Sequence, residues 1–217
     1  HFLHADPAQN LPLRLGLLDV WYRNFLHYTS RCIAPYHSGL KRMAPYLQQL
    51  EMESNGKSVT REGDSLAWPT APVIWGGGGN DGQHSYYQAL HQGTVSAALD
   101  FVLVKESPCG KPTLQQLANA NAAAQIEAFA MGNASDDPQR RHAGSRPCSV
   151  LLMNAVTPET IGALIALYEH KVFVQSLIWG VNAFDQFGVE LGKRLWAGFA
   201  SGELQPISTR LLSKAFD

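Results

Sequence analysis

Residues 72–104 read PVIWGGGGNDGQHSYYQALHQGTVSAALDFVLV, and this stretch decides the fold class. A short apolar run at 72–75 is followed by four glycines, a helix-like segment over 82–91 and a second apolar run over 99–104. Neither apolar run alternates with polar residues, as a strand with one solvated face would. A strand, a crossover helix and another strand in this order predict a parallel sheet that is covered on both faces.

The same alternation continues on both sides of this stretch. Apolar spacing predicts further helices over residues 11–28, 40–52, 113–131, 158–170 and 183–200. A third buried strand is predicted over residues 149–154, whereas 58–72 is polar and turn-rich and predicts a hairpin-like excursion, and 132–147 predicts a solvent loop. Together these elements predict an α/β fold, a three-layer αβα sandwich with a mainly parallel sheet.

Composition narrows the class of protein. The chain has 217 residues, 45% of them hydrophobic, which is enough to bury a core. The net charge is −1 without a long basic run, which argues against a partner that is nucleic acid or a membrane surface. Glu169, His170 and Lys171 interrupt the most apolar stretch, so no membrane-spanning helix is expected. Three cysteines without a CxxC pair favour a reducing, cytoplasmic location. The first Met is Met43, which suggests a piece of a longer chain.

The glycine-rich turn has more than one interpretation. Gly77, Gly79 and Gly82 fit the spacing of a dinucleotide-binding turn, and Glu106 follows the next strand at about the distance of a ribose contact. This pattern indicates a nicotinamide-dependent oxidoreductase as one alternative function. Against it, His84 crowds the helical turn where a pyrophosphate needs bare backbone. A plain glycine turn and a catalytic loop are the other two interpretations.

Glu53 and His84 are candidates for acid–base chemistry. Glu53 ends a predicted helix with Gln49 on the same face, so it is either a general base or a solvated surface carboxylate. His84 is expected in the first turn of its helix, where the helix dipole favours the neutral imidazole that accepts a proton. The alternative for His84 is a partly buried histidine held by one hydrogen bond.

Gln186 and Lys193 are seven residues apart, nearly two helical turns, so both side chains are expected on one side of a helix. They line a cleft on one interpretation and a solvent stripe on the other. His84 and His91 do not have the spacing of zinc ligands, and no metal site is predicted.

Five segments, taken in order, carry a resemblance to a known family. They are MESNGK at 52–57, GQH at 82–84 after Trp75-Gly76, HQGT at 91–94, GALIALYEHK at 162–171 and FDQFGVELGK at 184–193. In this order they resemble the glucose-6-phosphate isomerase family. The similarity runs from about Asn10 to Lys193 and covers less than half of a full-length family member.

The resemblance implies a sugar-isomerase (SIS) fold, with residues 1–217 forming the second domain including its C-terminal helix and the first domain absent. It implies interconversion of glucose 6-phosphate and fructose 6-phosphate by ring opening and proton transfer through a cis-enediol. Glu53 is then the base, His84 and Lys193 serve ring opening, and Gln49 and Gln186 contact the substrate. No metal or other cofactor is expected.

The resemblance also implies a homodimer in which His84 of one subunit completes the active site of the other. Two departures from the family pattern bear on activity. Asn80-Asp81 stands where the family has Thr-Asn, and the family's first domain, with its phosphate pocket, has no counterpart here. The isolated chain is therefore expected to be inactive, and a non-catalytic sugar-phosphate-binding domain remains an alternative.

Overall fold

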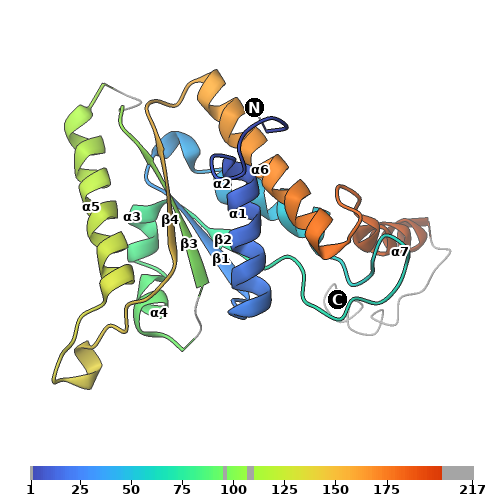
Figure 1. Cartoon of the computed structure of the whole chain (residues 1–217), viewed down its shortest axis with the longest axis horizontal. Helices are drawn as coiled ribbons and strands as arrows, with labels where there is room; N and C mark the ends of the chain where they lie inside the picture. The colour runs from blue at the N-terminus through green and yellow to red at the C-terminus, as the bar shows by residue number, and fades with distance from the viewer. Residues whose placement is uncertain (1, 95–96, 107–109, 202–217) are drawn as a thin grey trace. The chain divides into compact units, whose positions relative to one another are not determined.

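The computed structural model describes residues 2–94, 97–106 and 110–201, and the chain forms two units, His1–Phe184 and Asp185–Asp217. The first unit contains a sheet of four strands in the order β2-β1-β3-β4, with all three pairings parallel (Figure 1). The strands are β1 Ser30–Pro35, β2 Val73–Gly76, β3 Ala97–Val104 and β4 Cys148–Met153. The parallel sheet that the sequence predicts is confirmed.

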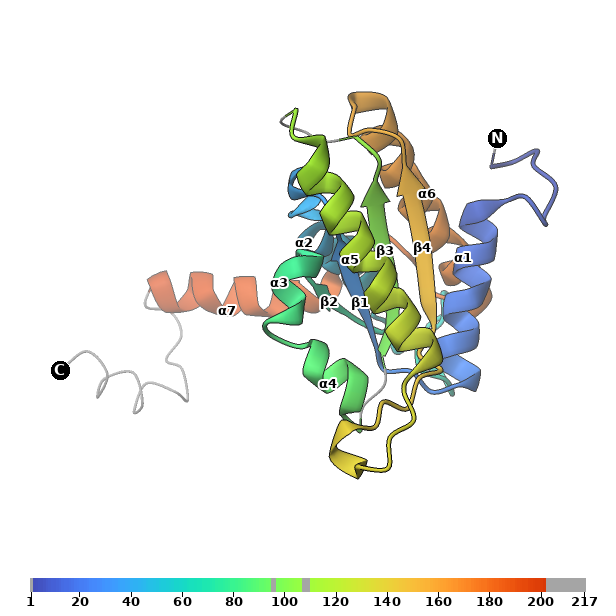
Figure 2. The ribbon, with the colours of Figure 1, turned by 90° about the vertical axis from the view of Figure 1, so that its left-hand side faces the viewer.

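Helices cover both faces of this sheet, as Figure 2 shows for the face under α5. On one face lie α3 (Gly79–Gln83), α4 (Tyr87–Gln92) and α5 (Pro112–Met131). The other face carries α1 (Leu11–Val20), α2 (Met43–Leu47) and α6 (Pro158–Trp179). Short helical turns complete this unit: η1 Trp21–Phe25, η2 Ser38–Leu40, η3 Gln48–Glu53 and η4 Pro138–Arg140. The fold is the predicted three-layer sandwich.

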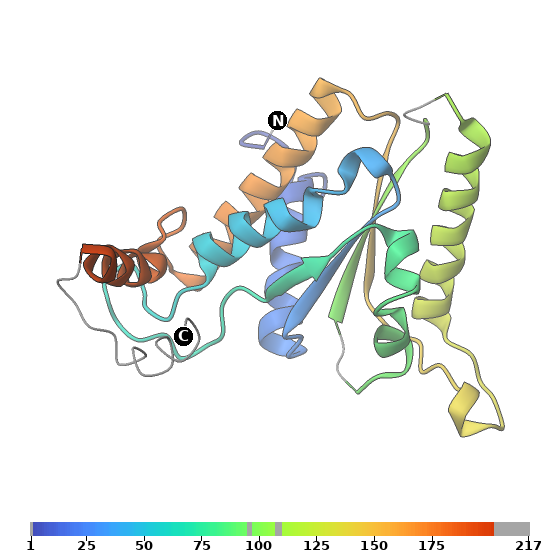
Figure 3. The same cartoon turned by 180° about the vertical axis from the view of Figure 1, so that it is seen from behind.

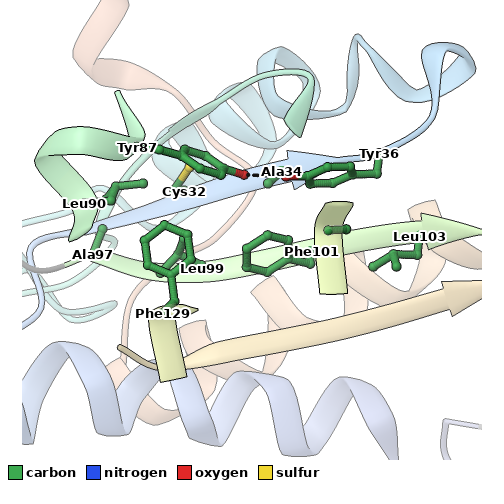
Figure 4. Close-up of a cluster of buried hydrophobic side chains, with 11 residues drawn as sticks. Cys32, Ala34, Tyr36, Tyr87, Leu90, Ala97, Leu99, Phe101, Leu103 and Phe129 are labelled. Carbon is green, nitrogen blue, oxygen red and sulfur yellow. Dashed lines mark hydrogen bonds between the residues drawn. The ribbon is translucent and has the colours of Figure 1, made fainter. Parts of the chain in front are cut away.

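Alternate residues of the central strands feed two separate cores. Cys32 and Ala34 of β1 face the α4 and α5 side, where Phe101 and Phe129 fill the space between sheet and helix (Figure 4). Ile33 points to the opposite core, beneath α2 and α6. Both faces of β3 are buried along its whole length, so this strand shows no regular polar alternation, and its run therefore predicts a covered parallel sheet.

Several predicted elements differ from those observed. β1 was not predicted, although it lies at the centre of the sheet. The single helix expected over 82–91 is two short helices, α3 and α4, and the helix expected over 158–170 continues to Trp179. The hairpin-like excursion is confirmed in its main feature, because Val59 and Ser65 form an antiparallel bridge.

α6 lies on the face of the sheet that also carries α1 and α2. It is the one described helix that is long and apolar enough to cross a membrane by length and composition, and such a helix is weak evidence for a span. Its N-terminus is fixed by a reciprocal cap between Thr157 and Thr160. It packs along α1, and buried Lys171, Gln175 and Ser176 face the protein interior.

The second unit is described from Asp185 to Ser201. It consists of the short turn η5 (Phe187–Val189) followed by α7 (Glu190–Ser201). Of the three cysteines, Cys32 and Cys148 are free thiols, and Cys109 lies outside the described residues.

Candidate active site

Glu53 and Gln49 lie on one π-helical segment, η3, that directly extends α2 (Figure 3). Glu53 is half-buried at the end of the segment and Gln49 is exposed. Two bonds tie the segment to β2: Gln48 Nε2 donates to the carbonyl of Ile74 at 3.0 Å, and the Ile74 amide donates to Met52 Sδ at 3.4 Å. π-helical turns are rare and are often found at functional sites.

The residues after Glu53 fix its C-terminal side. Buried Asn55 donates to the carbonyl of Val172 at 3.0 Å, which joins the segment to α6. The Lys57 ammonium donates to the Glu53 carbonyl at 2.8 Å. A Cβ at Gly56 would lie 2.3 Å from the Met52 carbonyl oxygen, so only glycine permits this close turn. The MESNGK segment therefore holds Glu53 on a backbone that is fixed on several sides.

His84 lies elsewhere. It caps the C-terminal end of α3 and is exposed, in the helical layer opposite to the one that carries Glu53. The prediction that His84 occupies the first turn of a helix is wrong, because α3 begins earlier, at Gly79, and ends just before the histidine. The helix N-terminus therefore gives no reason for a neutral imidazole at this position.

Gln186 and Lys193 belong to the second unit, and both are exposed. The prediction that they share one face of a single helix is wrong: Gln186 precedes η5, and only Lys193 lies in α7. The backbone turns at Ala183 and Phe184, where Phe184 has a φ of 65°, so the helix that the apolar spacing predicts over 183–200 begins only at Glu190. Of the five predicted site residues, the structure brings Gln49 and Glu53 together on one segment.

The glycine turn does not match a dinucleotide site. Its strand, β2, lies at the edge of the sheet, whereas the fingerprint strand of the dinucleotide fold is central. α3 has five residues, too short for the long helix whose N-terminus holds the pyrophosphate. Gly79 has a packing role instead, because a Cβ there would lie 1.9 Å from the ring of buried Tyr36.

This packing role gives a direct prediction. Gly79→Ala should lower the free energy of unfolding by about 1–3 kcal/mol, because the new methyl group overpacks the core against Tyr36. Gly77→Ala is the matched control two residues away, since nothing lies within 4 Å of its Cβ position. It should leave stability within about 1 kcal/mol of the original. Urea unfolding followed by fluorescence measures both, and equal losses would contradict the packing role.

The sequence patterns do not predict a group of charged side chains that lies buried behind the Glu53 segment. They are Asp19, Arg31, Glu51, Asp100 and Lys171, all at most 2% exposed. Burial lowers the pKa of Lys171, and the neighbouring Glu51 carboxylate opposes that shift. The pKa of the nearby Tyr168 is raised, first by burial and then by the Asp100 carboxylate. One pattern in the sequence indicates such buried charges: a single charged residue within an apolar run, as Asp19 in LLDVW and Asp100 in ALDFV.

The described residues contain no group of three or more His, Cys, Asp and Glu side chains arranged to hold a metal ion. Taken separately, the predicted site residues supply a half-buried carboxylate at Glu53, an exposed imidazole at His84 and an exposed ammonium group at Lys193. These groups suit proton transfer.

Comparison with known proteins identifies the family. The family model described as phosphoglucose isomerase matches residues 1–206. Glucose-6-phosphate isomerase of Albidiferax ferrireducens is 55% identical over 195 residues, which are 90% of this chain and 37% of that protein. The enzyme of the same name from Leptothrix cholodnii is 47% identical over 236 residues, covering 94% of this chain and 43% of that protein.

The fold agrees with these relatives. The crystal structure of a glucose-6-phosphate isomerase from Chlamydia trachomatis superposes with a TM-score of 0.90 at 38% identity, over 100% of this chain and 43% of that one. This chain thus spans roughly two fifths of the length of the relatives that it matches. With a matching family model, a shared fold and the MESNGK and FDQ segments in place, the chain belongs to the phosphoglucose isomerase family.

Proposed function

We propose that the complete protein interconverts glucose 6-phosphate and fructose 6-phosphate, with Glu53 as the base that moves a proton between C1 and C2. The observation that carries this proposal is the placement of Glu53. It is a half-buried carboxylate at the end of a π-helical segment that is bonded to β2 and α6 on either side. A general base needs such a fixed position relative to the carbon that it deprotonates.

The reaction requires proton transfers only. The ring opens when the anomeric hydroxyl loses a proton and the ring oxygen gains one, and we assign this step to His84 and Lys193. Glu53 then removes the proton from C2 of the open aldose, which gives the cis-enediol, and returns it to C1. A second proton moves from the oxygen on C2 to the oxygen on C1. Electrons and atoms balance without an external oxidant, so no cofactor is required.

Gln49 and Gln186 are the proposed substrate contacts. Gln49 is exposed on the same segment as Glu53, four residues earlier, and therefore on the same side of it. An amide in this position suits a hydrogen bond to a sugar hydroxyl next to the carbon that Glu53 deprotonates.

A cytoplasmic homodimer with a shared active site completes the proposal. Glu53 and His84 lie in helical layers on opposite faces of the sheet, which supports an arrangement in which they serve different sites. A twofold axis would bring the histidine of one subunit to the glutamate of the other.

The test uses a complete enzyme in which this chain replaces the matching segment of the full-length relative that is 55% identical to it. Incubated with glucose 6-phosphate in D₂O, this protein should form fructose 6-phosphate and exchange the C2 proton with solvent, both visible by NMR. Binding of the sugar phosphate without exchange would instead identify a non-catalytic sugar-phosphate-binding protein.

The shared site leads to a complementation prediction. Glu53→Gln and His84→Asn homodimers of the complete enzyme should both be inactive, but activity should return when the two are refolded together. Each mixed dimer has one site with both changes and one with neither, because a twofold axis exchanges the partners. Differently tagged subunits allow the mixed dimer to be purified and assayed. An inactive mixed dimer would mean that Glu53 and His84 act within one subunit.

A further inference from the structure

Five charged side chains form one connected cluster in the interior of the first unit. They come from five different elements: Asp19 from α1, Arg31 from β1, Glu51 from η3, Asp100 from β3 and Lys171 from α6. Each is at most 2% exposed. The cluster thus joins the Glu53 segment to the sheet and to the helices α1 and α6.

Lys171 is the link between this cluster and the segment. Its ammonium group lies 2.9 Å from Glu51 Oε2 and 2.5 Å from Asp19 Oδ2. Gln175, one turn further along α6, donates to the same two carboxylates, at 3.1 Å to Glu51 and 2.9 Å to Asp19. α6 therefore holds the core-facing side of η3 through two side chains.

Arg31 extends the network into the sheet. Its guanidinium group pairs with Asp19 and lies 2.5 Å from Asp100 Oδ1. Tyr168 donates to the other oxygen of Asp100 at 3.3 Å. Arg31 and Asp100 lie on neighbouring strands, so the far end of the network is fixed in the sheet.

Stability alone does not explain so many buried charges. Removing ions from water is costly, and replacement of a buried ion pair by apolar residues is often neutral or stabilising. The cluster also has three carboxylates against two cations. Charged contacts depend on direction, whereas apolar contacts do not. The cluster therefore permits one orientation of the η3 segment, and apolar packing would tolerate small rotations.

Orientation matters because Glu51 and Glu53 are two residues apart on a helical segment. Side chains at this spacing point to nearly opposite sides of the helix axis. Glu51 is 1% exposed and faces the core, whereas Glu53 is half-buried and faces outward. Any rotation of η3 about its axis that moves Glu51 therefore moves Glu53 as well.

We propose that Lys171 is a positioning residue for proton transfer: through Glu51 it sets the rotation of η3 and hence the position of the Glu53 carboxylate. This inference rests on the proposed role of Glu53 as the base. Misplacement of a catalytic group by about 1 Å can cost about 100-fold in rate. Loss of the ionic link should therefore lower kcat. The effect on KM should be smaller, because of the two proposed substrate contacts only Gln49 moves with η3, whereas Gln186 belongs to the second unit.

The main variant is the double change Lys171→Met with Glu51→Gln in the complete enzyme. It removes the ionic link without leaving the Glu51 carboxylate unpaired. Asp19 also loses Lys171 but keeps Arg31 and Gln175 as partners, so the variant should fold. We expect kcat to fall by about 10- to 100-fold, with KM for fructose 6-phosphate within about 3-fold of the original. Arg140→Met is the matched control, because it breaks an exposed ion pair with Asp137 and should leave kcat unchanged.

A purely structural cluster gives a different result. In that case kcat should fall only where the enzyme is destabilised. A double variant that keeps both the original melting temperature and the original kcat would overturn the proposal. If the double variant does not fold, the single variant Glu51→Gln tests the proposal. It leaves two carboxylates and two cations in the cluster, so the buried charges balance. We expect it to lose at least about 5-fold in kcat with KM within about 3-fold of the original, and an original kcat would overturn the proposal.

The same set of proteins separates this inference from the proposed function. If the unaltered complete enzyme does not isomerise the sugar phosphates, or if Glu53→Gln retains its rate, the proposed function fails. If Glu53→Gln is inactive and the Lys171 and Glu51 variants retain the original kcat, the positioning role alone fails.

Discussion

Glu53→Gln should lower kcat of the complete enzyme by about 10²- to 10⁴-fold, which is the usual contribution of a general base. The amide has nearly the shape of the carboxylate but cannot accept the carbon-bound proton. The side-chain bonds that hold η3 come from Gln48, Glu51, Met52 and the following Asn55, all of which the change leaves in place, so the segment should keep its position. KM for either sugar phosphate should therefore change little. A coupled assay for glucose 6-phosphate formation, with C2 exchange by NMR, measures the loss.

Glu62→Gln is the control for this experiment. Glu62 is an exposed carboxylate in the excursion between η3 and β2, and its removal should not alter the rate. A Glu53→Gln enzyme that turns over at the original rate would remove Glu53 as the base. A large rise in KM at unchanged kcat would make it a binding residue instead.

The second large effect concerns the chain by itself. The isolated 217 residues should fold but show no isomerase activity above background. The chain corresponds to roughly two fifths of its relatives, and binding energy from remote parts of a substrate is used to accelerate the chemical step. Loss of such contacts should therefore lower kcat as well as affinity.

The experiment compares the isolated chain with the complete enzyme at equal concentration. The mass of the chain is verified and its folding is checked by circular dichroism and cooperative unfolding. Turnover by the folded, isolated chain at the rate of the complete enzyme would show that this chain alone holds the catalytic machinery.

The sequence predicts the strands whose side chains are mainly apolar. β3 is found within a few residues of its bounds because both of its faces are buried and Asp100 is the single charge in its run. β2 is found from the short apolar run before the glycines, although it is an edge strand and Val73 is exposed. β1 escaped because it begins Ser30-Arg31 and ends in Pro35, a composition that does not indicate a buried strand. Arg31 is tolerated there only because Asp19 and Asp100 pair with it, and that pairing depends on residues far away in the sequence.

The candidate site was predictable where it depends on local order along the chain. Glu53 and Gln49 share one helical segment, so spacing alone places them on the same side. The position predicted for His84 is wrong because α3 starts at Gly79, and a run of glycines gives no local signal for the start of a helix. The roles of Lys171 and Glu51 depend on a contact between α6 and η3 across more than half of the chain, which no local pattern encodes.

The order of the sheet, β2-β1-β3-β4, has a consequence for how the chain reaches this structure. Ser30 pairs with both Val73 and Ala97, and Leu99 pairs with Cys148, so no two neighbouring strands are joined by a short hairpin. Each pairing requires the entropy cost of closing a long loop before any contact between the strands forms. Proteins dominated by such distant pairings fold slowly. The central strand β1 is synthesised before both of its neighbours and must wait for them with its edges unpaired. Folding intermediates of this chain are therefore the species most prone to aggregate. Slow refolding at low protein concentration is the condition under which mixed dimers should form in good yield.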